Sequence, residues 1–126
     1  MHRHLVVLLL GFVLLCPAVA GAVTDEDFRV KDTQSLLNLC TATADDPRHG
    51  EAIHFCHGYL VGAFHYYMVT HVALDNKPLF CMPDPAPSRN HTIGRFVDWA
   101  KAHPQYLNEV PVETEFRFLT ETWPCK

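Results

Sequence analysis

Cysteine content constrains the fold of this chain more than any other feature. Four cysteines lie within residues 21–126, with gaps of 16, 25 and 44 positions, and none of them belongs to a C-x-x-C pair. An even number of widely spaced cysteines in a small exported domain is typical of disulfide bonds, whereas a zinc site usually has closely spaced ligands. The sequence therefore predicts two disulfide bonds, and three pairings are open among Cys40, Cys56, Cys81 and Cys125.

The N-terminus has the features of an export signal. Arg3 lies in a short basic start, Leu5 to Cys16 is an apolar run, and the small residues of PAVA follow as a cleavage site. The apolar run is shorter than the roughly 20 residues that a membrane-spanning helix needs. We therefore predict a signal peptide over residues 1–20 and a single mature domain over residues 21–126.

The charge balance argues against a nucleic-acid-binding protein. The chain has 10 Lys and Arg against 14 Asp and Glu, which gives a formal net charge of −4, and removal of residues 1–20 also removes one arginine. Nucleic-acid binding needs a basic face, which a mildly acidic chain does not favour. No second apolar run has the length of a membrane helix, so we predict no membrane association after residue 20.

Hydrophobic periodicity predicts helices throughout the mature chain. A short first helix over residues 33–40 has its cap at Asp32 or Thr33. Residues 24–31 before it are charged and aperiodic, and they are predicted to be extended or frayed. No segment alternates polar and apolar residues in the way that a half-buried strand requires.

A long second helix is predicted after Asp46 and Pro47, which together form a helix start signal. The helix continues to about Val72. At about 100° per residue, one set of its side chains projects to the same side and is predicted to face the core. This set consists of Ile53, Cys56, Leu60, Ala63, Phe64 and Tyr67.

A proline-rich connector separates the second helix from two further helices. Four prolines between Pro78 and Pro87 exclude regular structure there. Ser88 is expected to cap a third helix that ends near His103. A fourth is predicted over residues 111–122, with its apolar face formed by Val112, Phe116, Leu119 and Trp123. The expected fold is therefore all-α, a small disulfide-stapled bundle of four to five helices.

An up-and-down order of these helices selects one disulfide pairing. Cys40 ends the first helix and Cys56 lies in the early turns of the second, so both are at one end of the bundle. The second helix carries the chain to the opposite end, where the connector holds Cys81. The third and fourth helices make a round trip that returns Cys125 to that end. The predicted pairs are Cys40–Cys56 and Cys81–Cys125.

Three histidines of the second helix, His54, His57 and His65, fall within a stripe of about 80°. Gly58 and Gly62 lie beside them. One interpretation is a metal-binding or pH-sensing face. The other is a solvated polar face, with the glycines allowing close approach of another helix or chain. No carboxylate lies among these histidines to complete a metal site, so we predict neither a metal nor a cofactor.

The sequence contains no recognisable catalytic motif. It lacks G-x-S-x-G, H-E-x-x-H and a phosphate-binding loop, and its glutamates are predicted to lie mostly on exposed faces. Cys56 and His57 are neighbours on a helix and therefore point about 100° apart, which does not suit a nucleophile and its base. We predict that the protein is not an enzyme.

Five short segments occur in an order that is specific when taken together. They are SLLNLC (35–40), CHGYLVGAF (56–64), FCMP (80–83), FVDWAKAHP (96–104) and WPC (123–125). This pattern resembles the Rap/Tai family of type VI secretion immunity proteins, and the match extends over nearly the whole mature chain.

The resemblance implies a small, helical, disulfide-bonded periplasmic protein that binds and inhibits a peptidoglycan amidase toxin. It implies no catalytic residue, because inhibition comes from plugging the toxin's active-site groove, and several such proteins are homodimers. The four cysteines and Gly58, Tyr59 and Gly62 are then fold-defining motif residues. Tyr59 is expected to bury its ring and to use its hydroxyl on a backbone group.

The shared motifs do not include the surface that contacts the toxin. We predict that residues 103–110, HPQYLNEV, form a protruding loop with Tyr106, Asn108 and Glu109 as contact residues. The alternative is an ordinary interhelical loop in which Tyr106 folds onto the bundle.

Two other functions are compatible with the sequence. A periplasmic stress or acid chaperone would expose apolar surface on protonation, and seven of the nine histidines lie after residue 20. Carboxylates also titrate at the pH values where such chaperones act. A metal-binding periplasmic protein would depend on His54, His57 and His65 alone.

Overall fold

The computed structural model describes residues 21–126, and within this range the chain forms helices and loops without a β-strand. The predicted signal peptide over residues 1–20 lies outside the described residues. The all-α prediction is confirmed. The elements are the 3-10 helices η1 (Asp27–Arg29) and η2 (Pro104–Tyr106) and the α-helices α1 (Thr33–Cys40), α2 (His49–Ala73), α3 (Arg89–Ala102) and α4 (Pro111–Thr122).

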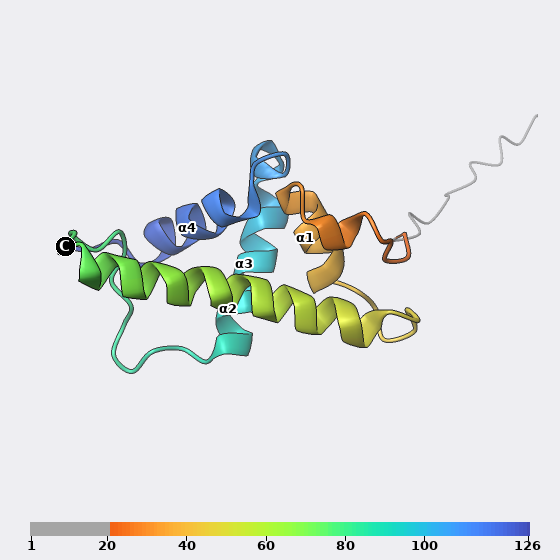
Figure 1. The fold of residues 1–126 in the computed structure, drawn as a ribbon, viewed down its shortest axis with the longest axis horizontal. Coiled ribbons are helices and arrows are strands. Elements are labelled where there is room, and N and C mark those ends of the chain that lie inside the picture. The colour runs from red at the N-terminus through yellow and green to blue at the C-terminus, as the bar shows by residue number, and fades with distance from the viewer. Residues whose placement is uncertain (1–20) are drawn as a thin grey trace, which may run out of the picture.

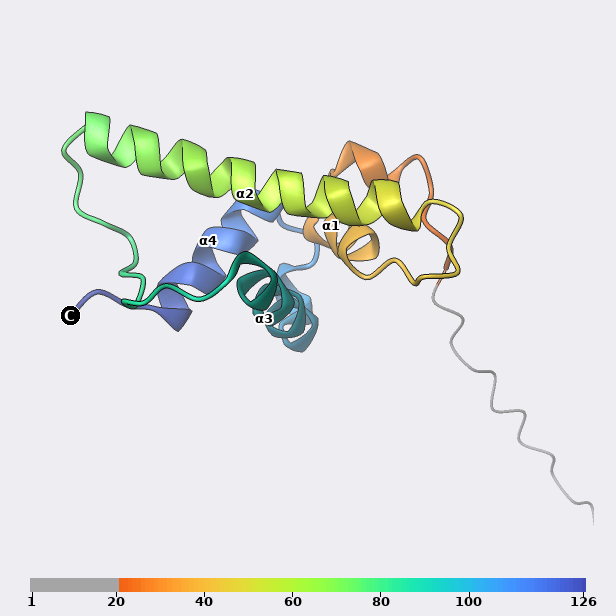
Figure 2. The same cartoon turned by 90° about the horizontal axis from the view of Figure 1, so that it is seen from below.

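Helix α2 runs along the length of the molecule, and the other helices lie on one side of it (Figures 1 and 2). Helix α1 packs near its N-terminal end, α4 lies nearer its C-terminal end, and α3 crosses it. The expected up-and-down order is therefore wrong. The reason is the connector between α2 and α3, which leads the chain back to the middle of the molecule before α3 begins (Figure 1).

The core lies between the N-terminal half of α2 and the inner faces of α1, α3 and α4. Phe96 of α3 and Phe118 of α4 meet edge to face at its centre, with ring centroids 5.8 Å apart.

Of the predicted α2 face, Cys56 and Leu60 are buried, and Phe64 and Tyr67 are partly buried against the core. Ile53 and Ala63 are half-buried, and Ala52 takes the fully buried position beside Cys56.

Both predicted disulfide bonds are confirmed, Cys40–Cys56 and Cys81–Cys125. The first joins the end of α1 to α2 inside the core, where Cys56 is fully buried. The second joins the connector to the C-terminus, and Cys81 N–H also donates a hydrogen bond to Trp123 O at 2.8 Å. The two bonds therefore fix different ends of the molecule.

The start of α2 differs from the prediction. The helix begins at His49 and not at Pro47, because the carboxylate of Asp46 is used in a turn. Asp46 accepts hydrogen bonds from Val23 N–H at 2.8 Å and from Arg48 N–H at 2.7 Å. These bonds lower the pKa of Asp46, and they tie the beginning of the described chain to the α1–α2 turn.

The prediction for residues 24–31 is wrong. This segment is not extended or frayed but contains η1. The buried carboxylate of Asp27 organises this segment, because it accepts from the N–H and hydroxyl of Thr24, both at 2.8 Å, and from Asn38 Nδ2 at 2.7 Å. Burial alone would raise the pKa of Asp27, but the hydrogen bonds from Asn38 and Thr24 hold it below its usual value. The hydrogen bond from Asn38 on α1 therefore helps to fold this charged, aperiodic segment.

Two of the predicted caps are confirmed. Asp32 accepts from Ser35 N–H at 2.8 Å at the start of α1, and Ser88 accepts from His91 N–H at 3.3 Å at the start of α3. The connector between α2 and α3 has no regular structure, as its prolines predicted. Phe80 is its buried anchor.

Replacement of each cysteine pair by alanine should destabilise the oxidised protein. In the chain-entropy model, removal of Cys40–Cys56 costs about 3 kcal/mol and removal of Cys81–Cys125 about 4 kcal/mol of unfolding free energy. Urea unfolding followed by circular dichroism measures both losses. The matched control is the wild-type protein under reducing conditions, which should lose more than either variant. A variant with wild-type stability would show that its disulfide does not stabilise the fold.

Candidate functional site

The side chain of Tyr106 in the predicted contact loop is folded onto the bundle, which is the alternative considered above. Its ring stacks on Trp99 with centroids 5.7 Å apart and an angle of 7° between the planes. The guanidinium of Arg117 also lies over the Tyr106 ring, with its central carbon 4.3 Å from the ring centroid. His103 also stacks on Trp99, at 4.1 Å. Tyr106 is therefore half-buried and helps to fix the loop conformation.

Backbone carbonyls of the same loop bind the first turn of α1. Thr33 N–H donates to Glu109 O at 2.9 Å, and Gln34 N–H donates to Leu107 O at 3.0 Å. These two N–H groups have no partner within α1, because the first turn of a helix leaves its donors free. The buried hydroxyls of Thr33 and Thr114 lie 2.7 Å apart and continue the contact into α4. The loop is consequently held at its backbone from two sides.

The remaining predicted contact residues differ in their surroundings. Glu109 pairs with Arg117, at 3.2 Å from both carboxylate oxygens, and is partly buried. This hydrogen bond is the main cause that raises the pKa of Arg117. Asn108 is exposed. Of the three predicted contact residues, Asn108 is the one whose side chain is directed to solvent from a fixed backbone.

The histidine stripe of α2 lies partly in solvent. His54 and His65 are exposed and His57 is half-buried. Within residues 21–126, no group of three or more His, Cys, Asp or Glu side chains is arranged to hold a metal ion.

Gly58 and Gly62 lie on an open face of α2. A Cβ atom added at either glycine would meet no other part of the described chain within 4 Å, so no helix of this chain approaches them closely. They line a shallow groove together with Tyr59, Tyr66 and Phe116, among others. The expected close approach of another helix is therefore not found within residues 21–126, and close approach of another chain stays a prediction.

The C-terminal half of α2 carries apolar side chains into solvent. Tyr66, Val69 and Val72 are 72%, 70% and 73% exposed. A contiguous apolar face of this kind is typical of an interaction surface. None of the helices in the described part of the chain combines the length and apolarity required to cross a bilayer.

Tyr59 is half-buried, as expected, and its ring stacks on Phe55 with centroids 6.5 Å apart. The expected hydrogen bond from its hydroxyl to a backbone group is not among the bonds of residues 21–126. Burial raises the pKa of Tyr59, and the neighbouring Glu115 adds to this shift. A second polar group, Glu115, therefore lies close enough to influence this tyrosine.

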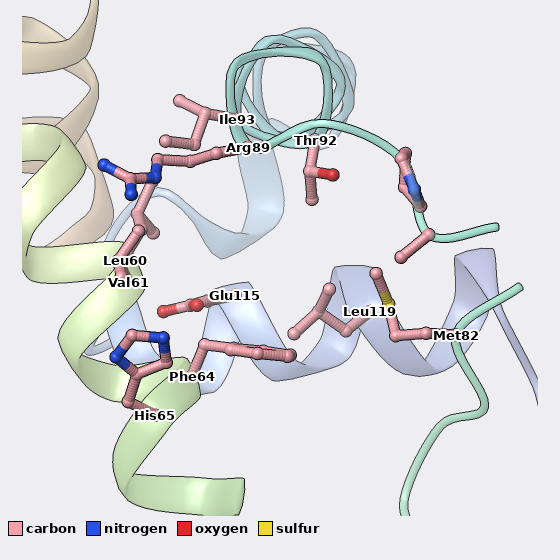
Figure 3. A pocket seen from close by; sticks show the side chains of 12 residues that line it. Leu60, Val61, Phe64, His65, Met82, Arg89, Thr92, Ile93, Glu115 and Leu119 are labelled. Atoms are coloured by element: carbon pink, nitrogen blue, oxygen red, sulfur yellow. The ribbon is translucent and has the colours of Figure 1, made fainter. Parts of the chain in front are cut away.

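That group, Glu115, lies in an apolar pocket between α2, α3, α4 and the connector (Figure 3). The pocket has a volume of about 260 Å³. Glu115 is 5% exposed, and its Oε2 has no hydrogen-bond partner within the described residues. Burial raises the pKa of Glu115 to about 8, so that its carboxyl group is mainly protonated at neutral pH.

Sequence analysis missed Glu115 because the predicted apolar face of α4 is only part of its buried face. Leu119 of the predicted set is buried, and Phe116 and Trp123 are partly buried against the core. The buried face of this helix contains Thr114, Glu115 and Phe118 with Leu119, whereas Val112 is 37% exposed. A glutamate among apolar positions of an amphipathic helix is normally placed on the solvent side. The signal that was available is the spacing of Glu115 from Phe118 and Leu119, three and four positions apart, which puts all three on one face.

Comparison with protein families identifies the relatives of this chain. A family model described as Rap1a immunity proteins matches residues 32–125. The chain belongs to this family. Comparison with curated proteins and with solved structures gave no match. Membership in the Rap1a immunity family confirms the resemblance found in the motifs, and it indicates an immunity protein whose partner is a toxin and whose action is non-catalytic inhibition.

The pH dependence of stability should reveal the buried carboxyl group. Because the pKa of Glu115 is about 8 in the fold and ordinarily 4.5, its stabilising effect is complete below about 4.5 and is lost as the pH rises to about 8. The free energy of unfolding should fall by up to about 1.4 kcal/mol per pH unit in this range. Glu115→Gln should lack this slope in urea unfolding measured at several pH values.

Glu113→Gln is the matched control, since Glu113 is exposed on the same helix and this variant should keep the wild-type slope. Equal slopes in wild type and Glu115→Gln would mean that Glu115 ionises normally in the folded protein.

Proposed function

We propose that residues 21–126 act in the periplasm as a stoichiometric inhibitor of a peptidoglycan amidase toxin delivered by type VI secretion. Residues 1–20 are removed as a signal peptide in this proposal. Support comes from the Rap1a immunity family match and from the five ordered motifs. Binding alone performs this function, and no residue of the chain takes part in a reaction.

The observation that carries the proposal is the fixed loop over residues 103–110. A loop that enters an enzyme groove binds more tightly when its conformation is set before binding, because less conformational entropy is lost. Here the stacking of Tyr106, its contact with Arg117, and the hydrogen bonds to α1 set that conformation. In Figure 1 the loop lies at the end of α3 that is remote from the connector.

The structure changes the role proposed for each loop residue. Asn108 makes the direct contact with the toxin, because it is exposed. Tyr106 and Glu109 act mainly by holding the loop, through Trp99 and Arg117. A combined replacement of all three would therefore mix loss of contact with loss of loop structure.

The acid chaperone remains the second candidate, and the exposed apolar residues Tyr66, Val69 and Val72 are the observation that favours it. The buried carboxyl group of Glu115 opposes it, since this group stabilises the fold at low pH. The chaperone would need acid to open the structure.

Affinity capture tests the proposed function. The oxidised mature protein is used as bait in periplasmic extract from source cells with an active secretion system, at about pH 7 and about pH 4. One dominant partner at the higher pH, whose peptidoglycan amidase activity the bait inhibits, is the expected result. Many unrelated partners at the lower pH alone would favour the chaperone.

Asn108→Arg should weaken binding of the captured toxin at least about tenfold, which corresponds to about 1.4 kcal/mol, without changing the thermal unfolding midpoint. The added side chain is larger and charged, and it stands at an exposed position. Asn90→Arg is the matched control, because Asn90 is exposed at the opposite end of α3. Unchanged affinity in Asn108→Arg would exclude this loop tip from the interface.

We also propose that the protein forms a homodimer, with the open face of α2 at Gly58 and Gly62 as the contact. Gly62→Leu should then shift the protein from dimer to monomer in analytical ultracentrifugation. The monomer fold should persist, because a Cβ atom added at this position meets no other part of the described chain within 4 Å. Gly94→Leu is the matched control, at an equally open helical glycine on α3. A wild-type protein that is monomeric at high concentration would exclude the dimer.

A further inference from the structure

The pocket around Glu115 has the composition of a binding site for a small amphiphilic group. Its walls are apolar, with Leu60 and Phe64 from α2, Ile93 from α3 and Leu119 from α4. Figure 3 shows the side chain of Glu115 extending from α4 toward α2, near Phe64 and His65. His65, Arg89 and Thr92 also line the pocket, and Glu115 is its buried polar group. A few polar groups among apolar walls are the arrangement by which ligand pockets fix the orientation of a ligand.

Glu115 makes this pocket different from an ordinary packing defect. Its Oε2 is buried and has no partner among residues 21–126, although buried polar atoms in proteins are nearly always hydrogen-bonded. A ligand that supplies the missing hydrogen bond would gain the free energy that this unpaired atom costs the free protein.

The protonation state of Glu115 defines which ligand group fits best. With its pKa raised to about 8 by burial, the carboxyl group at neutral pH offers one O–H donor and one carbonyl acceptor. An amide group offers the complementary acceptor and donor. An ammonium group would require Glu115 to ionise and would itself lose its hydration, and a carboxylate would provide acceptors only.

The charges around the pocket argue against a cationic ligand. The titratable or charged groups near Glu115 are Tyr59 and His65 of α2 and Arg89 of α3. His65 and Arg89 are exposed, and Figure 3 shows the side chain of Arg89 reaching from α3 toward α2. Arg89 disfavours an entering cation.

We propose that this pocket binds an aliphatic primary amide, with the alkyl chain against Leu60, Ile93 and Leu119 and the amide group hydrogen-bonded to the carboxyl group of Glu115. The same chemistry is present in a free small amide and in a glutamine side chain of a partner protein. The proposal concerns this group and does not depend on the proposed toxin.

Hexanamide is the probe for this site. Titration into isotope-labelled protein near pH 6.5, below the pKa of Glu115, should shift the NMR signals of Leu60, Ile93 and Leu119 with millimolar affinity. Hexylammonium and hexanoate should bind at least about fivefold more weakly. Tighter binding of either charged probe, or no shifts at these residues up to the solubility limit, would overturn the proposal.

Variants of Glu115 separate the hydrogen bond from the shape of the pocket. Glu115→Gln keeps a donor and an acceptor and should bind hexanamide with an affinity similar to that of wild type. Glu115→Leu should bind it at least about tenfold more weakly. Xenon, which needs no hydrogen bond, should still bind to Glu115→Leu and would show that the pocket persists. Equal hexanamide affinity in wild type and Glu115→Leu would refute the assigned role of the carboxyl group.

Two further measurements complete the test. Hexanamide affinity should fall as the pH rises through about 8 in wild type and in His65→Asn, but not in Glu115→Gln. A pH dependence that disappears in His65→Asn would assign it to the histidine and contradict the proposal.

Displacement of hexanamide by a captured toxin would assign the site to a protein side chain, and binding of both together would assign it to a free amide.

Discussion

Covalent cross-linking at two ends is the constraint on which this fold depends. Helix α2 has 25 residues, yet Ala52, Cys56 and Leu60 are its only buried positions. A helix with so little buried surface is weakly held by hydrophobic contacts, since burial is the main source of helix stability in a protein. The Cys40–Cys56 bond fixes its first half to α1, and the Cys81–Cys125 bond fixes the connector that follows it. The exposed C-terminal half of α2 is free to carry an interaction surface for this reason.

Much of this fold is predictable from local signals, and the failures have identifiable causes. The helices, the caps at Asp32 and Ser88, and the disulfide pairing follow from periodicity and spacing. The pairing is correct although the assumed up-and-down order is not, because it depends only on which cysteines share an end of α2. The segment containing η1 was missed since its structure depends on a carboxylate, Asp27, that meets a distant donor on α1.

The candidate site was less predictable than the fold. The position of the loop over residues 103–110 was predictable from the sequence. The different surroundings of Tyr106, Asn108 and Glu109 within it were not. Whether Tyr106 reaches a partner or stacks on Trp99 depends on where α3 and α4 place Trp99 and Arg117. The burial of Glu115 was not predicted for a related reason. A carboxyl group is expected to lie in solvent, and its burial here depends on how α2, α3 and α4 pack around it.

All four cysteines in residues 21–126 are consumed by the two bonds, and this has a consequence for where the protein can work. A reducing cytoplasm prevents these bonds, and a small domain with a total stability of about 5–15 kcal/mol then loses a large part of it. An unfolded chain is the form that an export channel accepts. Oxidation would then control folding, because the chain gains its binding surface only in a compartment where the two disulfide bonds can form.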